Sequence, residues 1–168
     1  WSGVLFHIKG DGTIYLGLDN NTYASSTSSA IASNTWPHVA ITRNTGSAGK
    51  FFINGTQDGT FSNGNNVAAA STYPIYMYIG ANYATQAEGF DGIVTYTPTG
   101  YISNARIVIG EQVYTTGFTP TTEELTTSSQ GVTAANTKFL GCQSTVAHTD
   151  AVTNTYISNA AGDPTAST

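Results

Sequence analysis

Glycine, asparagine, serine and threonine interrupt this 168-residue sequence within about every ten residues, and no window places apolar side chains at helical spacing. The apolar residues instead alternate over short stretches, as they do from Trp36 to Asn44. The strongest turn signal is Asn54-Gly55, because both residues accept the positive φ angles of a type I′ hairpin. A chain of this length is close to the size of one domain. The pattern therefore predicts a single all-β domain, a two-sheet antiparallel β-sandwich with almost no helix.

Eight segments are predicted to be strands, because each combines β-branched or aromatic residues with turn signals at its ends. We expect one weaker strand within Asp19 to Ser33 and another at Ile93 to Tyr96. Apolar parity slips by one residue near Ser103-Asn104, which predicts a β-bulge there. The eight segments are Gly3 to Lys9, Thr13 to Leu18, Trp36 to Asn44, Lys50 to Ile53, Thr56 to Phe61, Tyr73 to Gly80, Tyr101 to Ile109 and Thr137 to Cys142.

The composition becomes polar from Gln143 onward, after the last apolar segment. We therefore assign residues 1–145 to the sandwich and residues 146–168 to a polar C-terminal tail. The tail allows one further strand near Tyr156-Ile157.

The charge balance argues against two classes of partner. Charged residues make up 9% of the chain and the formal net charge is −5, and the five basic residues are scattered. A nucleic-acid surface needs clustered lysine and arginine, and no apolar run approaches the ~18 residues of a membrane span. We therefore expect neither nucleic-acid binding nor membrane insertion. Cys142 is the only cysteine, and its apolar neighbours predict a small buried core residue.

Several motifs occur in an order that is typical of one superfamily. The run Trp36 to Arg43 (WPHVAITR) resembles the W-x-H-V-A-x-x-R strand of the laminin-G and concanavalin-A-like sandwiches, and Phe51 to Thr56 resembles the Y-V-N-G hairpin that follows it. Later motifs are similar to a subgroup common in structural proteins of bacteriophages, marine phages included. These motifs are Phe90-Asp91-Gly92, Tyr101 to Val108, Val113-Tyr114, Phe118-Thr119-Pro120 and Phe139 to Ser144.

The resemblance implies a jelly-roll fold and also shows two departures from the phage pattern. Residues Ile93 to Gly100 stand between the F-D-G motif and the Y-I-S-N motif, which are contiguous in that subgroup. The insertion is a candidate for a contact specific to this protein. The family's opening strand is also missing before Trp1, so we expect an incomplete chain or a strand supplied by a neighbour.

The sequence offers no convincing catalytic constellation. Sandwich glycosidases of the superfamily carry two carboxylates on one concave strand, about 5 Å apart in a retaining enzyme. Glu123-Glu124 lies in a threonine-rich linker where successive side chains point apart, and Glu88 with Asp91 lies in a loop. The three histidines have no serine or cysteine in a nucleophile-elbow context. We predict that the protein is not an enzyme, and we interpret Arg106 as a structural partner of carboxylates or carbonyls.

The region from Tyr83 to Tyr101 is the candidate ligand surface. Aromatic faces stack on sugar rings, and asparagine or aspartate side chains bind hydroxyl groups. The same region fits an edge-covering loop or a subunit contact, since exposed tyrosines serve interfaces equally well. The residues assigned to a glycan or a protein partner are Tyr83, Phe90, Asp91, Tyr96 and Tyr101.

Calcium is the one cofactor that the resemblance raises, because related lectin and laminin-G sandwiches hold Ca²⁺ on loops through oxygen ligands. Asparagine and aspartate are also frequent in loops for reasons of turn geometry alone. The residues with suitable chemistry are Asp19, Asn20, Asn82 and Asp91.

Taken together, the motifs predict a structural module on the exterior of a bacteriophage virion, in a fibre, an appendage or a capsid decoration. Its partners would be other copies of itself or other virion proteins. The alternative is a carbohydrate-binding or adhesion module that recognises glycans of a host surface or an extracellular polysaccharide. That module would lie on such a fibre, or on a protein that is secreted or displayed on the cell surface of a bacterium.

Overall fold

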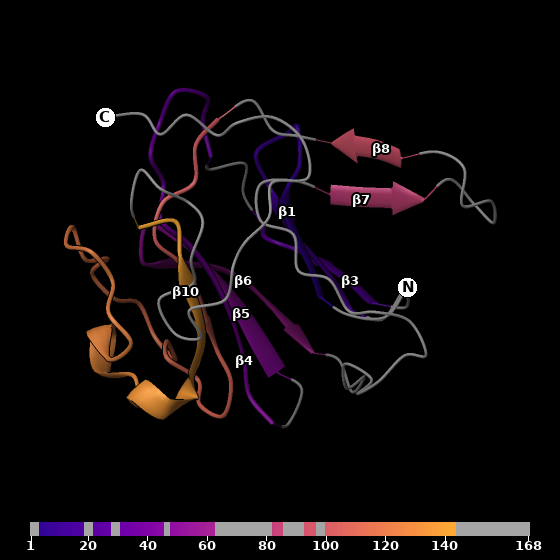
Figure 1. Ribbon diagram of the computed structural model, residues 1–168. Coiled ribbons are helices and arrows are strands. Elements are labelled where there is room, and N and C mark those ends of the chain that lie inside the picture. The colour runs from indigo at the N-terminus through magenta and orange to yellow at the C-terminus, as the bar shows by residue number, and fades with distance from the viewer. Residues whose placement is uncertain are drawn as a thin grey trace.

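The structure, a computed structural model, describes residues 4–18, 22–27, 31–45, 48–62, 82–85, 93–96 and 100–143. All of its strand pairs are antiparallel. Helix in these ranges is limited to two short 3₁₀ turns, η1 at Ser129–Gly131 and η2 at Ala134–Asn136 (Figure 1). No helix among them has the length and apolar character of a membrane span. The prediction of an all-β chain is confirmed.

The first sheet consists of β1 (Val4–Ile8), β2 (Ile14–Leu18) and β3 (Thr22–Ser25), in that order. A tight turn joins β1 to β2, as the Gly10-Asp11-Gly12 sequence favours. Gly12 has a φ of +83°, and the Asp11 carboxylate accepts bonds from the backbone N–H and the hydroxyl of Thr13, at 2.9 Å and 2.6 Å. The weaker strand expected after Asp19 is β3.

The second sheet consists of β4 (Val39–Arg43), β5 (Ala48–Ile53) and β6 (Thr56–Ser62), with β5 in the centre. Asn54 and Gly55 join β5 to β6 with φ angles of +51° and +77°. Both values are positive, so the predicted type I′ hairpin is confirmed.

A β-bulge in β6 sets which of its residues point toward the first sheet. Gln57 pairs with Phe52 and Thr60 pairs with Lys50, so that Asp58 and Gly59 together face one residue, Phe51. Gly59 has a φ of +138°, which a residue with a side chain rarely adopts. The extra residue allows Phe61 to enter the core.

The two sheets pack face to face around one apolar cluster. Ile14 and Leu16 of β2 meet Phe51, Ile53 and Phe61 of the second sheet, and all five are buried. Burying one such side chain stabilises the fold by about 1.5–3 kcal/mol relative to exposure. The backbone N–H of Thr27 donates to the Asp58 carbonyl at 2.8 Å and links the layers at the bulge. The predicted two-layer sandwich is confirmed. Partly buried residues around the cluster are Ala24, Ile31, Val39 and Ile41.

Phe6 and Ile8 lie on the same face of the first sheet as this cluster but stay about half exposed, at 46% and 47%. Their cross-strand partners are Leu16 and Ile14, which are buried. The difference arises because β1 is at the outside of the β1-β2-β3 order, whereas β2 is central.

A further antiparallel pair is formed by β9 (Ala105–Val108) and β10 (Thr137–Gly141). The residues between them, 109–136, carry both 3₁₀ turns (Figure 1). Phe139 and Leu140 of β10 are buried, as predicted for a closing core strand, and so are Leu125 and Val132 of the connecting segment. A two-stranded pair, β7 (Asn82–Thr85) with β8 (Ile93–Tyr96), completes the strands described.

Several predicted strand limits are corrected by the structure. The strand expected from Trp36 begins at Val39, and the strand expected from Tyr101 begins at Ala105. The bulge expected near Ser103-Asn104 is wrong, because those residues precede the strand and Asn104 has a φ of +55°. The irregularity is in the partner strand, between Thr137 and Phe139.

The prediction of β8 is confirmed, whereas β7 lies in a region expected to be a loop. The strand predicted for Tyr73 to Gly80 lies outside the described residues. So does the tail at 146–168, and its separation from the sandwich stays a prediction.

Candidate functional site

Two aromatic rings form an exposed pair on the surface of the molecule. Trp36 precedes β4 and is 68% exposed, and Tyr101 precedes β9 and is 65% exposed. Their ring centroids lie 6.3 Å apart and their planes differ by 23°. A large apolar surface that stays open to water is informative, because most such side chains are buried. We call Trp36 and Tyr101 the aromatic pair.

Hydrogen bonds fix the chain close to both rings. On the Trp36 side, the His38 N–H donates to the Asn54 side-chain oxygen at 2.9 Å, and the Asn54 N–H donates to the His38 carbonyl at 2.8 Å. Beyond Tyr101, the Asn104 N–H donates to the Cys142 carbonyl at 3.0 Å. The chain beside the aromatic pair is therefore anchored to Asn54 in the β5–β6 turn on one side and to Cys142, which follows β10, on the other.

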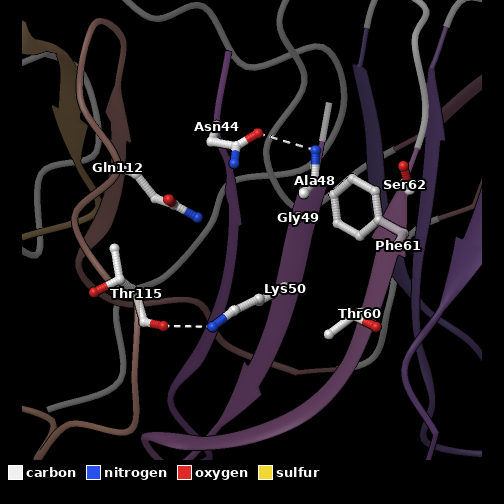
Figure 2. A pocket seen from close by; sticks show the side chains of 9 residues that line it. All are labelled: Asn44, Ala48, Gly49, Lys50, Thr60, Phe61, Ser62, Gln112 and Thr115. Carbon is white, nitrogen blue, oxygen red and sulfur yellow. Dashed lines mark hydrogen bonds between the residues drawn. The ribbon is translucent and has the colours of Figure 1, made fainter. Parts of the chain in front are cut away.

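A hollow of about 480 Å³ lies at the other end of β4 (Figure 2). It is formed by the end of β4, by β5 and β6, and by the segment around Thr115. Its lining offers hydroxyl, amide and ammonium groups and no carboxylate. We call it the Lys50 hollow; its residues are Asn44, Ala48, Gly49, Lys50, Thr60, Phe61, Ser62, Gln112 and Thr115.

Residues 112–118, which we call the covering segment, pack on the face of the second sheet that points away from the first. The Thr42 hydroxyl donates to the Tyr114 carbonyl at 3.0 Å, and the Gln112 amide donates to that hydroxyl at 3.2 Å. Lys50 Nζ donates to the Thr115 carbonyl (Figure 2). The fully buried Phe52 ring packs edge-to-face against the Tyr114 and Phe118 rings, at centroid distances of 6.2 Å and 5.5 Å.

Burial and a nearby cation change the acid–base behaviour of this face. Desolvation lowers the pKa of His38, and the positive charge of Arg106 lowers it further. Desolvation likewise raises the pKa of the Tyr114 hydroxyl, against an opposing effect of Arg106. The His38 ring contacts Phe118 and Tyr114 edge-on, at 5.3 Å and 6.2 Å. Burial in this aromatic cluster therefore favours the neutral form of His38.

Arg106 is a structural donor, as predicted. Its Nη1 donates to the Ser129 carbonyl at 2.8 Å and to the Thr126 carbonyl at 3.4 Å.

Cys142 is half-buried and not fully buried as expected, and desolvation raises the pKa of its thiol. Glu123 and Glu124 are both exposed, which agrees with a solvated pair.

The structure places only part of the predicted ligand surface. Tyr101 is exposed and belongs to the aromatic pair. Tyr83 lies in β7 and Tyr96 in β8, where they pair with Thr95 and Asn82 and not with each other. Phe90 and Asp91 lie outside the described residues.

The predicted calcium ligands are not brought together by the part of the chain that the structure describes. Asp19, Asn20 and Asp91 fall outside it, and Asn82 is the first residue of β7. Within the described ranges, no group of three or more histidine, cysteine, aspartate or glutamate residues could hold a metal ion. Calcium binding stays a prediction.

Sequence reasoning missed Trp36 and the Lys50 hollow. Trp36 is predicted to be the first residue of a strand, although the Pro37 that follows it disfavours a central strand position. The hollow combines residues up to 71 positions apart, from Asn44 to Thr115, and no local pattern links them. Only the fold brings these groups together.

One comparison with known proteins supports this architecture. The sequence model of a laminin G domain family, described as the concanavalin A-like lectin/glucanases superfamily, matches residues 2–108. The match covers more than half of the 168 residues, including the aromatic pair and Lys50. It ends before the covering segment. No curated protein and no solved structure matches the chain significantly.

Proposed function

The chain belongs to the concanavalin A-like lectin/glucanases superfamily, and from this premise we propose that it is a non-enzymatic carbohydrate-binding module that acts in adhesion. The observation that carries the proposal is the aromatic pair. Trp36 and Tyr101 expose about two-thirds of their surface, and hydrogen bonds at His38 and Asn104 anchor the chain two and three residues away from them. An aromatic face that is already rigid loses little entropy when a sugar ring stacks on it.

The distribution of carboxylates supports binding over hydrolysis. A glycosidase of this superfamily would need an acid and a second carboxylate flanking the bond to be cleaved. Asp58 is the only carboxylate on the strands that the structure describes. Its side chain accepts a bond from the Thr27 hydroxyl at 3.3 Å, at the link between the sheets. The Asp58 carboxylate therefore has a structural role, and no second carboxylate lies beside it on a described strand.

The proposal is tested by binding to an array of neutral and acidic oligosaccharides. We expect the purified chain to bind at least one neutral oligosaccharide, and Trp36→Ala or Tyr101→Ala to weaken that binding by about tenfold, since each removes half of the stacking surface. Phe6→Ala is the matched control, because Phe6 is a half-exposed aromatic residue on β1 that is not part of the pair. Tyr96→Ala examines the remaining part of the predicted surface.

Two results would refute the proposal. The first is wild-type protein that binds no saccharide, and the second is a Trp36→Ala Tyr101→Ala double variant that binds as tightly as wild type. Thermal melting of each variant shows whether the fold is retained. Turnover of a bound glycan would refute the non-enzymatic part.

A place on the exterior of a phage virion is the second candidate. It is supported by the ordered phage-like motifs and by the contacts that their residues make. Asn104 of the Y-I-S-N motif accepts bonds from the Leu125 N–H at 3.1 Å and the Gln143 amide at 3.3 Å, and Tyr114 of the V-Y motif stacks on Phe118 of the F-T-P motif. Residues from different motifs therefore contact one another, Asn104 with Gln143 and Tyr114 with Phe118.

This second candidate predicts repeated copies of the chain on purified virions and self-association or docking on neighbouring virion proteins. Mass spectrometry of the virions and light scattering of the purified chain are the measurements. A strictly monomeric chain that is absent from every virion examined would contradict it and would support a secreted or cell-surface module of a bacterium.

A further inference from the structure

We propose that the Lys50 hollow binds a sugar residue that carries a carboxylate, with the Lys50 ammonium group as its charge partner. The inference rests on the proposed function, because it takes the ligand to be a saccharide. It adds a second binding site and a chemical class of sugar, neither of which follows from the aromatic pair.

The charges around the hollow favour an anion. Lys50 is the only charged residue among the nine that line it, although the chain as a whole has a net charge of −5. The neighbouring acid, Glu111, is engaged elsewhere: its carboxylate accepts bonds from the Thr133 N–H at 2.7 Å and the Asn136 amide at 3.2 Å. Asp58, the carboxylate on β6, does not line the hollow and accepts a bond from Thr27. The lining of the hollow therefore carries one positive charge and no negative charge, on an acidic protein.

The Lys50 ammonium group retains donors for a ligand. An ammonium group has three N–H bonds, and the Thr115 carbonyl accepts one of them. This contact fixes the position of the charge beside the hollow, and the remaining hydrogens can reach a carboxylate. Charge-assisted hydrogen bonds of this kind are about twice as strong as neutral ones.

The other lining groups suit the hydroxyls of a sugar. The Asn44 side-chain oxygen accepts the Ala48 N–H at 3.0 Å, so its amide nitrogen remains as a donor. Gln112 donates one N–H to Thr42, which leaves its oxygen as an acceptor. Figure 2 shows Asn44, Gln112 and Lys50 around the same space. A hollow with a fixed cation, an amide donor and an amide acceptor matches an acidic sugar better than a simple anion.

The hollow is separate from the aromatic pair. Trp36 precedes β4 and Asn44 follows it, and a five-residue strand extends about 17 Å at 3.3 Å per residue. One sugar ring cannot span that length. A change at Lys50 should therefore leave binding at the aromatic pair intact.

The experiment compares an oligogalacturonate with its methyl ester, which has the same size and no charge. Binding of the purified chain to both is measured by calorimetry. We expect wild type to bind the acid about tenfold more tightly than the ester, which corresponds to about 1.4 kcal/mol. Lys50→Gln should abolish this preference and Lys50→Arg should retain it.

Lys138→Gln is the matched control. Lys138 is exposed and its Nζ also donates to a backbone carbonyl, that of Ala135, but it does not line the hollow. The variant removes the same charge and should retain the preference for the acid. A second measurement needs no variant: raising the ionic strength should weaken binding of the acid and not of the ester.

The outcomes separate this inference from the proposed function. Neutral oligosaccharide binding without any preference for the acid over the ester would overturn the inference alone. A preference that persists in Lys50→Gln would also overturn it. A preference that depends on Lys50, in a protein whose neutral binding is unaffected by loss of Trp36 and Tyr101, would support the hollow and overturn the role of the aromatic pair.

Discussion

The rings of Tyr114 and Phe118 lie face to face, with centroids 3.6 Å apart and planes 6° from parallel. Together they cover Phe52, which is fully buried in the centre of the second sheet. The Phe118 N–H also donates to the Gly55 carbonyl at 3.0 Å, so the covering segment is joined to the β5–β6 hairpin. Both faces of β5 are thereby buried, one by the first sheet and one by the covering segment.

Removing one ring of this stack should destabilise the protein. Phe118→Ala is expected to lower the free energy of unfolding by about 2 kcal/mol, less than the loss of a fully buried ring because Phe118 is half-buried. For a domain of this size, that corresponds to a fall in melting temperature of about 4–8 °C. Ile109→Ala is the control, since Ile109 is 61% exposed and should change stability little. Equal melting temperatures for wild type and Phe118→Ala would contradict the packing role of the stack.

Gly55 is expected to tolerate no side chain. A Cβ at this position would lie 1.9 Å from the Phe118 carbonyl oxygen, whereas a Cβ at Gly131 would meet nothing within 4 Å. Both glycines have a φ of +77°, so alanine is strained to a similar degree at either one. Gly131→Ala should therefore cost about 1–2 kcal/mol, and Gly55→Ala about 2 kcal/mol more. Chemical denaturation measures the difference, and similar values for the two variants would show that the close approach to Phe118 is relaxed at low cost.

Asn104 combines an unusual backbone angle with two acceptor bonds. Asn104→Gly keeps the positive φ accessible but removes the acceptor of the Leu125 N–H, and is expected to cost about 1–2 kcal/mol. Asn104→Ala should cost about 1 kcal/mol more, because alanine disfavours a φ of +55°. Denaturant titration of the two variants separates the terms. If glycine were neutral, the side-chain bonds of Asn104 would contribute nothing to stability.

Acid should weaken the packing of the covering segment through His38. The pKa of His38 is lowered in the folded protein, so the unfolded chain binds a proton more readily than the folded chain. The stability that depends on neutral His38 is present above about pH 6.5 and is lost as the pH falls toward the lower folded value. The melting temperature should therefore decrease between about pH 7 and pH 5.

A histidine substitution identifies the group responsible. His38→Gln should flatten the decrease between these pH values, because glutamine does not titrate. His7→Gln is the comparison. Burial also lowers the pKa of His7, and the positive charge of Lys9 lowers it further. A decrease that His38→Gln leaves unchanged would assign the acid sensitivity to other groups.

Local physics made a large part of the fold predictable. Asn54-Gly55 and Gly10-Asp11-Gly12 identify hairpins from two or three residues, because their backbone angles are available to few other residue types. The alternation of Val39 and Ile41 with Ala40 and Thr42 likewise assigned the faces of β4, and the register with β5 agrees.

The remaining features depend on contacts between distant segments. Thr42 and Tyr114 are 72 positions apart, and nothing near either residue indicates that they bond. The exposure of Trp36 follows from the beginning of β4 at Val39, three residues later than alternation suggests. Half-burial of Cys142 has the same origin, since it follows the last residue of β10 and has a φ of +59°.

The long separation between the second sheet and its cover has a consequence for synthesis on the ribosome. β4, β5 and β6 are complete by Ser62, whereas the covering segment ends at Phe118. At roughly 5–20 residues per second, Phe52 is exposed on the nascent chain for several seconds before its cover can emerge. We therefore expect aggregation-prone intermediates early in production of the protein. We also expect folding to be slower than local hairpins alone would allow. A chain truncated before Tyr114 should remain in that aggregation-prone state.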